Sequence, residues 1–241
     1  MLLAIDAGNS FVKLAYHDGQ VWLDSQRILL LDFCREPKQY LQRPVLKVMV
    51  SNVAGKIVQK ALETVFPQQS IYFINAAAFT YGVRNQYAEP EQLGADRWCA
   101  LIAVRELIQE DCVIVSLGTA LTVDMLTSDG RFLGGVIAPG MQLMRMALAQ
   151  ATDAVAPAVG RVSTFPSNTA DAVQTGLTYA ALGVIEKTIA DFEKQCQGPV
   201  SCILTGGGAI EISSYLTRPF KVVDNLVLDG IRLLAQQGNA A

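Results

Sequence analysis

The sequence predicts an α/β protein built from two duplicated halves, and two observations carry that prediction. Each half opens with an apolar strand that runs into a polar, glycine-containing turn, at residues 6–10 and at residues 118–119. In each half a second apolar strand then reaches an Asp-Gly pair, Asp18-Gly19 or Asp129-Gly130, before a third strand. Asp-Gly between alternating strands is a strong hairpin signal. A repeat at this spacing indicates a duplicated domain, because the repeats of solenoids are far shorter.

The length of the chain agrees with two domains. A chain of 241 residues accommodates one large domain or two small ones, and the duplication favours two. We therefore expect an N-terminal domain at residues 1–108 and a C-terminal domain at residues 109–241. Hydrophobic residues make up 51% of the chain, so each half can bury a core.

Each half continues from its three-stranded antiparallel meander into alternating helices and strands. Apolar periodicity predicts helices at residues 31–42 (interrupted by Pro37), 56–66, 93–109, 141–150, 169–197 and 226–237. Strands are expected at residues 45–51, 70–74 and 200–204, a polar aromatic loop at residues 81–90, and a mobile connection at residues 152–167. This order predicts mixed sheets that are covered by helices.

Composition excludes several classes of protein. The net charge is −3 and no basic run occurs, which argues against nucleic acid as the main partner. No apolar stretch of about 20 residues is free of charge, and the N-terminus leads straight into a strand carrying Asp6, so neither a membrane span nor a signal peptide is expected. The five cysteines lack CxxC spacing and favour reduced thiols in a cytoplasm. His17 is the single histidine, which argues against zinc, and we expect it to be an exposed turn residue.

The first turn has the chemistry of a nucleotide-phosphate site. Gly8 lets the backbone approach a bulky anion, because it has no Cβ. Asn9 and Ser10 can hydrogen-bond phosphate oxygens, Lys13 can neutralise charge, and Asp6 can hold a hydrated Mg²⁺. These residues predict a kinase. The alternative is an ordinary hairpin turn, since the same residue types are common in turns.

Two later segments carry further glycine-rich turns. Gly118 and Thr119 repeat the pattern of the first turn, a glycine and a hydroxyl residue between two apolar strands. Gly206 and Gly207 lie between a strand and a helix. Such a turn lets backbone amides and a helix N-terminus approach a flat or anionic ligand, although the spacing is not that of a dinucleotide fingerprint. A flexible turn is the alternative, but beside two phosphate-type turns a role on the adenine or ribose side is favoured. Residues 134–140 are also rich in glycine, which allows the backbone to approach either another strand or a ligand. The motif by itself does not decide between the two.

The tetrapeptide at residues 94–97, Gly-Ala-Asp-Arg, opens a predicted helix. One interpretation is that Asp96 and Arg97 are solvated charges that compensate the helix dipole. The functional interpretation makes Asp96 a general base for a substrate hydroxyl. Arg97 then clamps a substrate carboxylate, whose geometry its planar fork matches.

Taken together and in this order, the motifs resemble those of type III pantothenate kinases, members of the acetate kinase, sugar kinase, Hsp70 and actin superfamily. The resemblance spans residues 6–208. It implies two ribonuclease-H-like domains of the actin-like ATPase superfamily with ATP in the cleft between them and Mg²⁺ near Asp6. It also implies ATP-dependent phosphorylation of pantothenate to 4′-phosphopantothenate, the entry to coenzyme A synthesis, with Asp96 as the base.

The resemblance further assigns residues to each ligand. The nucleotide-binding residues it implies are Asp6, Gly8, Asn9, Ser10, Lys13, Gly118, Thr119, Gly206 and Gly207. The substrate-binding residues it implies are Tyr87, Gly94, Ala95, Asp96, Arg97 and Thr169. Family members are homodimers, and the neighbouring subunit completes the pantothenate pocket.

One position departs from the family pattern. Family members commonly carry an aspartate two residues before the second turn's glycine, where it holds a monovalent cation, potassium or ammonium. This chain has Ser116 there, and a neutral hydroxyl cannot supply the same charge. The monovalent cation is therefore in doubt, or is held through other oxygens. Ser10 replaces the usual threonine but keeps its hydroxyl.

Two rival functions share these features. A different kinase of the superfamily, acting on a sugar or a short carboxylic acid, would have both phosphate turns. A non-catalytic, nucleotide-dependent interaction protein would also have them, and some relatives were first described as accessory factors for transcription. Asp96 beside Arg97 argues against the second rival, because an interaction module needs no base.

Overall fold

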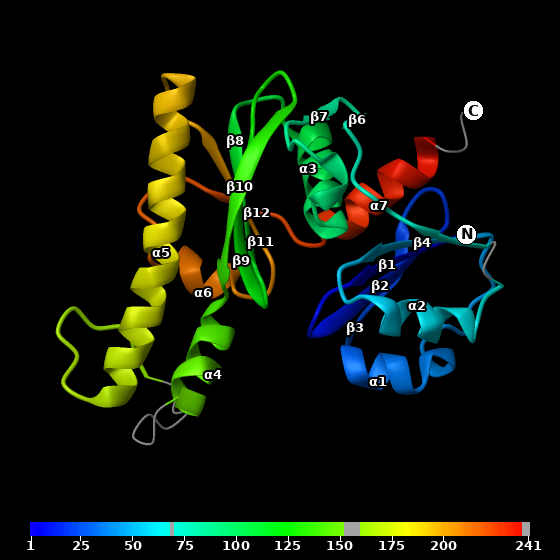
Figure 1. Ribbon diagram of the computed structural model, residues 1–241, viewed down its shortest axis with the longest axis horizontal. Coiled ribbons are helices and arrows are strands. Elements are labelled where there is room, and N and C mark those ends of the chain that lie inside the picture. Colours follow the sequence, from blue (N-terminus) through cyan, green and yellow to red (C-terminus); the bar gives the residue numbers. More distant parts are fainter. Residues whose placement is uncertain (68–69, 152–159, 238–241) are drawn as a thin grey trace. The chain divides into compact units, whose positions relative to one another are not determined.

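The computed structural model describes residues 1–67, 70–151 and 160–237. The chain forms two compact units. Unit 1 comprises Met1–Gln109, Gly130–Phe132 and Asn225–Ala241, and unit 2 comprises Glu110–Asp129 and Leu133–Asp224 (Figure 1). Both units contain a sheet flanked by helices, which confirms the predicted α/β class. The duplicated domains expected at residues 1–108 and 109–241 stay a prediction.

Unit 1 is built on a mixed sheet with the strand order β3-β2-β1-β4-β5. The first three strands are the predicted meander: β1 (Leu2–Ala7) pairs antiparallel with β2 (Phe11–His17), which pairs antiparallel with β3 (Trp22–Leu29). On its other side β1 pairs in parallel with β4 (Lys47–Asn52), which pairs in parallel with β5 (Ile71–Phe73). This arrangement places the end of β1, and the turn that follows it, at the middle of the sheet.

Both faces of this sheet are buried because neighbouring residues of β1 point in opposite directions. Leu3 and Ile5 belong to the apolar core that includes residues of α1 (Leu30–Arg35) and α2 (Lys56–Glu63). Ala4 belongs to a second core with residues of α3 (Ala95–Leu107) and α7 (Leu226–Gln237). Burial on both faces explains why β1 reads as a continuous apolar run.

The pairing of α3 with α7 depends on one glycine. A Cβ at Gly230 would lie 2.0 Å from the carbonyl oxygen of Cys99, so only glycine allows this close approach. Trp22 also donates from Nε1 to the carboxylate of Asp229 at 3.0 Å. These contacts hold α3, whose first turn carries Asp96, against the rest of unit 1.

Two expectations about unit 1 are wrong. The loop predicted at residues 81–90 contains β7 (Val83–Asn85), which pairs with β6 (Phe79–Thr80) and, at Arg84 and Asn85, with the first residues of β10 (Arg131–Pro139). His17 is buried, not exposed: its ring packs edge-on against Trp22 at 4.9 Å, and its Nδ1 accepts a hydrogen bond from the amide of Gly19. The helix predicted at residues 31–42 is interrupted at Pro37, as expected: α1 ends at Arg35, and a short 3-10 turn follows at Pro37–Gln39. A second 3-10 turn, Pro90–Gln92, precedes α3.

Unit 2 repeats the architecture with the strand order β12-β11-β8-β9-β10. Strand β8 (Cys112–Leu117) pairs antiparallel with β9 (Ala120–Leu126) and in parallel with β11 (Ser201–Thr205), which pairs in parallel with β12 (Lys221–Val222). The helices are α4 (Met141–Ala151), α5 (Thr169–Cys196) and α6 (Ala209–Ser213). Helix α6 follows Gly206 and Gly207, as the sequence predicted, whereas strand β12 was not expected from the sequence. Residues 152–159 of the expected mobile connection lie outside the described residues.

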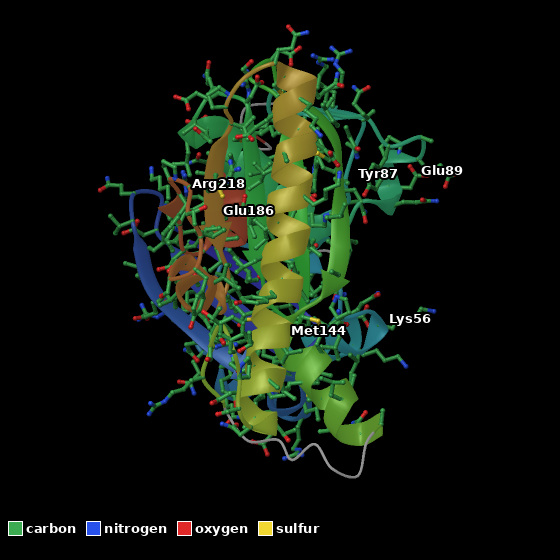
Figure 2. All side chains as sticks on the ribbon, turned by 90° about the vertical axis from the view of Figure 1, so that its left-hand side faces the viewer. Lys56, Tyr87, Glu89, Met144, Glu186 and Arg218 are labelled. Carbon is green, nitrogen blue, oxygen red and sulfur yellow. The ribbon has the colours of Figure 1, made fainter. Side chains whose placement is uncertain are left out.

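The long helix α5 covers the core of unit 2. Its buried residues Leu177, Ile185 and Phe192 pack with apolar side chains of β8, β9 and β11. An ion-pair cluster fixes its C-terminal half: Arg218 contacts Glu186 at 3.2 Å and Glu193 at 2.9 Å (Figure 2). Helix α5 therefore provides a rigid support for the polar residues that unit 2 carries near α4 and α6.

Candidate active site

The turn between β1 and β2 holds the first predicted cluster. The amide of Gly8 donates to the carbonyl of Phe11 at 3.0 Å and closes the turn. Asp6, at the end of β1, is paired with Lys13 on β2 and with Ser51 on β4. Strand pairing therefore places a carboxylate, an ammonium group and a hydroxyl together, as the sequence predicted for the first two.

The electrostatics of Asp6 are unusual for a carboxylate beside a lysine. Desolvation by the surrounding protein and the negative charge of Asp96 raise its pKa to about 7, and Lys13 and Ser51 only partly oppose this. The structure thus brings Asp6 and Asp96, which are far apart in sequence, near each other in unit 1. A buried carboxylate whose ionisation is opposed, with a second carboxylate near it, forms a site suited to a cation.

The donors near Asp6 fit Mg²⁺. Carboxylate and hydroxyl oxygens are hard ligands, and Ser51 Oγ is buried without a hydrogen bond of normal geometry to any described residue. Among the described residues no group of three or more His, Cys, Asp or Glu side chains could hold a metal ion. Mg²⁺ usually takes one or two carboxylates and completes its shell with water and phosphate.

Helix α3 starts at the predicted tetrapeptide. Asp96 Oδ1 accepts a hydrogen bond from the amide of Arg97 at 2.8 Å, so the carboxylate turns back over the first turn of the helix. A Cβ at Gly94 would lie 2.7 Å from that oxygen, and glycine therefore leaves room for it. The helix N-terminus stabilises a negative charge at this position.

Arg97 is held by aromatic residues of unit 1. It is buried, its Nη1 donates to the Tyr87 hydroxyl at 3.2 Å, and its guanidinium carbon lies 5.8 Å from the centre of the Phe132 ring. Tyr87 packs on Phe132 at 5.4 Å, and its amide donates to Asn85 Oδ1. The predicted pair of Tyr87 and Arg97 is thus assembled. Phe132 was missed, because no local pattern marks an apolar strand residue as the support of an arginine.

Three glycine-rich motifs meet at the second turn, in unit 2. The amide of Gly140 donates to the carbonyl of Thr119 at 2.9 Å, and the amide of Gly208 donates to the carbonyl of Leu117 at 3.0 Å. A Cβ at Gly140 would lie 2.2 Å from the Gly118 carbonyl oxygen, and one at Gly206 would lie 2.5 Å from the Leu117 carbonyl oxygen. Only glycine permits this packing, so residues that are distant in sequence form one backbone-lined surface.

Ser116 and Thr169, which were singled out from the sequence, and Asp124, which was not, lie outside these clusters. Ser116 is on β8 between Thr122 of β9 and Thr205 of β11, so hydroxyl groups line that position. Asp124 is buried in the sheet, where the Thr122 hydroxyl lies 3.4 Å from its carboxylate. Thr169 is the first residue of α5, exposed and in unit 2, whereas the other predicted substrate residues are in unit 1.

Comparisons with known proteins identify the family to which the chain belongs. A family model described as type III pantothenate kinase matches residues 2–191. The chain is 39% identical over 249 residues to a type III pantothenate kinase of Aromatoleum aromaticum, covering 100% of both chains. It is 37% identical to one of Nitrosomonas eutropha, covering 99% of this chain and 95% of the relative. Among solved structures, a Sinorhizobium meliloti protein provisionally named a 2-dehydro-3-deoxygalactonokinase aligns with a TM-score of 0.68 at 14% identity, covering 98% and 99%. That likeness shows the fold, which is that of sugar kinases and actin-like ATPases.

Proposed function

The chain belongs to the type III pantothenate kinase family, and we propose that Asp96 is the general base of the reaction that gives the family its name. That reaction transfers a phosphoryl group from ATP to pantothenate and gives 4′-phosphopantothenate, the first step of coenzyme A biosynthesis. Phosphoryl transfer needs reactants in line and charge stabilised around the moving group. The chain's own residues supply both, together with a base for the acceptor hydroxyl.

The observation that carries the assignment of Asp96 is its position at the start of α3. There it lies near Asp6 and immediately before Arg97. In this proposal the substrate carboxylate lies at the Arg97 guanidinium and the substrate hydroxyl lies at the Asp96 carboxylate. The carboxylate of Asp96 then accepts the hydroxyl proton as the oxygen attacks phosphorus.

Pantothenate carries a carboxylate, and the Arg97 environment suits it. The guanidinium is anchored by the Tyr87 hydroxyl and the Phe132 ring, so little freedom is lost when a carboxylate binds. Backbone groups of Gly94 and Ala95 at the helix start complete the contacts that we assign to this subunit. The family reaction makes pantothenate the substrate, and we expect this clamp to favour an acidic acceptor over a neutral sugar.

We further propose that Asp6 holds Mg²⁺ beside Lys13, while Gly8, Asn9 and Ser10 contact phosphate oxygens. When bound, Mg²⁺ neutralises charge on the phosphates that approach these residues. Gly118, Thr119, Gly206 and Gly207 contribute backbone donors to the same nucleotide. Ser116, flanked by Thr122 and Thr205, offers neutral oxygens to a monovalent cation in place of a carboxylate.

We also propose a cytoplasmic location, because ATP and the coenzyme A pathway are found there. None of the described helices is both long and apolar enough to cross a bilayer.

We also propose a homodimer in which Thr169 reaches the pantothenate pocket of the neighbouring subunit. Both units expose large apolar side chains, and we assign those on unit 2 to the interface. They include Ile137 on β10 (65% exposed), Phe165 (88%) and Tyr179 on α5 (52%). Thr169 lies at the exposed start of α5, close in sequence to Phe165.

The test is ADP release with ATP and Mg²⁺, measured with pantothenate, with a sugar, with a short hydroxy acid and without acceptor. We expect release to depend on pantothenate and to be weak with the other acceptors. Repeating the assay in potassium and in sodium buffer tests the cation: a small difference is expected because Ser116 supplies no charge. Equal release with all acceptors would contradict the substrate assignment.

A further inference from the structure

Tyr87, whose hydroxyl accepts a hydrogen bond from Arg97, lies on a loop and not on a helix or a strand. With Glu89 it belongs to the segment that connects β7 to the 3-10 turn Pro90–Gln92 (Figure 2). Strand β7 lies beside α3, which carries Arg97 (Figure 1). Loops are in general more mobile than the elements they connect. The Tyr87 hydroxyl can therefore meet Arg97 in one fixed position only if other groups hold the loop.

The side chain of Asn85, the last residue of β7, spans this loop. Its Oδ1 accepts a hydrogen bond from the amide of Tyr87 at 3.0 Å, and its Nδ2 donates to the carbonyl of Pro90 at 3.0 Å. One carboxamide thus bonds to both ends of the loop. Asparagine suits this task because its side chain both donates and accepts, whereas an ionised carboxylate only accepts and an ammonium group only donates.

Asn85 is itself fixed to two neighbouring segments. Its amide donates to the carbonyl of Ala78 at 2.9 Å, and the next amide, that of Gln86, donates to the carbonyl of Phe132 at 3.1 Å. Asn85 is only 6% exposed, so its two side-chain bonds are shielded from water. Removal of this side chain would leave both ends of the loop without these partners.

The apolar contact of Tyr87 with Phe132 supplies a different kind of constraint. The two ring centres are 5.4 Å apart, with the ring planes at 41°. Burial of apolar surface has no preferred direction, so this contact keeps the tyrosine ring in place against Phe132 without fixing where its hydroxyl lies. Hydrogen bonds do have a preferred direction. Asn85 therefore supplies the directional constraint on the Tyr87 backbone.

The position of the Tyr87 hydroxyl matters for a carboxylate bound at Arg97. The hydroxyl accepts from Arg97 Nη1 at 3.2 Å. Its own proton points away from the guanidinium, because a guanidinium has no acceptor. A carboxylate has two oxygens and can accept from the hydroxyl and from the guanidinium at once. A shift of the loop would separate these two donors.

We propose that Asn85 is a positioning residue for the substrate carboxylate: it holds residues 85–90 so that the Tyr87 hydroxyl and Arg97 bind that carboxylate together. The proposal rests on the proposed role of Arg97 in binding the carboxylate of pantothenate. In this role Asn85 touches neither the substrate nor the reacting atoms. It acts on the affinity for pantothenate, and it leaves the transfer step and the affinity for ATP unchanged.

The experiment measures ADP release by the full chain and separates kcat, the KM for pantothenate and the KM for ATP. The variants are Asn85→Ala, Tyr87→Phe and the double variant. We expect Asn85→Ala to raise the pantothenate KM about tenfold, the equivalent of about one hydrogen bond to a charged group, with kcat and the ATP KM within about twofold. When Tyr87→Phe has already removed the hydroxyl, the same change should raise the pantothenate KM by less than about twofold, because the two residues act as one unit.

Two further variants separate positioning from a general effect on stability. Asp18→Ala is the matched control, because Asp18 Oδ1 also accepts from the amide two residues on, that of Gln20 at 2.8 Å, in the turn between β2 and β3. It should change neither KM. Asn85→Ser is the conservative variant, whose hydroxyl can accept from the Tyr87 amide, though more weakly. It should recover part of the pantothenate affinity.

Two results would overturn the proposal. One is an unchanged pantothenate KM in Asn85→Ala, and the other is an equal rise with and without the Tyr87 hydroxyl, which would indicate a structural role only. If Asn85→Ala does not fold, Asn85→Ser is compared in the same two backgrounds, and an equal rise there has the same meaning. Failure of the kinase assignment is a different result, because ADP release by the wild type would then not respond to pantothenate at all.

Discussion

Asp6, the proposed Mg²⁺ ligand, lies where ionisation of its carboxylate costs free energy in the folded protein. Its carboxylate is surrounded by protein and lies near a second carboxylate, and both effects oppose ionisation. A folded protein at neutral pH therefore carries a group that would ionise more easily in the unfolded chain. Strain of this kind is common where a cation binds, because the bound cation relieves it.

The pH dependence of stability follows from that cost. The folded pKa of Asp6 is about 7 against 3.8 for the free side chain, so between these values the folded state holds a proton that the unfolded state has released. The contribution of Asp6 to stability is therefore lost as pH rises from about 4 to about 7, by on the order of 2–4 kcal/mol. Asp6→Asn removes this loss.

Urea unfolding at pH 5.5 and pH 8.0 without divalent cation measures the effect. We expect wild type to lose more stability than Asp6→Asn between the two pH values, and we expect Mg²⁺ with ADP to restore stability to wild type only. Parallel behaviour of the two proteins would show that Asp6 ionises normally in the fold.

The glycine motifs of unit 2 act at the scale of elements. Strand β8, strand β10 and the turn before α6 are brought together at Gly118, Gly140 and Gly206. At Gly140 and Gly206 the backbones approach too closely for any side chain. The shape of the second phosphate turn is therefore set by three elements, and we expect a change in any of them to weaken nucleotide binding.

Gly140→Ala tests this arrangement. Its Cβ would meet the Gly118 carbonyl oxygen at 2.2 Å, so we expect a loss of about 1–3 kcal/mol in unfolding free energy and weaker ADP binding. The matched control is Gly183→Ala on α5, where nothing lies within 4 Å. There we expect a gain of about 0.5–1 kcal/mol, because alanine restricts the unfolded chain. Urea unfolding measures both, and a stable Gly140→Ala variant with normal ADP affinity would contradict the account.

Local patterns predicted most elements, and the failures have physical reasons. Helix α7 begins and ends at the predicted residues, because its apolar stripe is strong and complete. Strand β7 is only three residues long and exists through pairing with β6 and β10, which no local pattern reveals. His17 has a turn-like sequence context, but Trp22 folds over it.

The residues of the candidate site could be predicted from the sequence only as far as their chemical type and spacing. The types and spacing of Asp6, Lys13, Asp96 and Arg97 indicated their chemistry before the fold was known. The proximity of Asp6 to Asp96 and the support of Arg97 by Phe132 depend on contacts between distant segments. Residue type can suggest what a side chain does, but only tertiary contacts show what holds it.

At the scale of the whole molecule, the proposed dimer makes a specific prediction about Thr169. If Thr169 serves the neighbouring subunit, Asp96→Asn and Thr169→Val subunits complement each other when mixed, since one site of the mixed dimer has both residues intact. Random exchange gives half mixed dimers, each with one active site of two, so we expect about a quarter of wild-type activity.

The control for complementation is each variant alone. Both should be weakly active and should elute as dimers in size-exclusion chromatography with light scattering. Ile137→Asp, which places a charge among the exposed apolar side chains of unit 2, should shift the mass toward one chain, whereas Leu46→Asp in unit 1 should not. Mixed subunits that regain no activity would show that Thr169 acts within its own subunit or not at all.

The central claim is that this chain is a pantothenate kinase whose base is Asp96, and one measurement tests it most directly. Pantothenate-dependent ADP release is compared in wild type, Asp96→Asn and Asp32→Asn, whose carboxylate is an exposed surface group on α1. We predict strong pantothenate dependence in wild type and Asp32→Asn. Asp96→Asn should lose about a hundredfold or more in turnover while it still binds ADP, as expected when a general base is removed. Turnover in Asp96→Asn within a few-fold of wild type would contradict the claim.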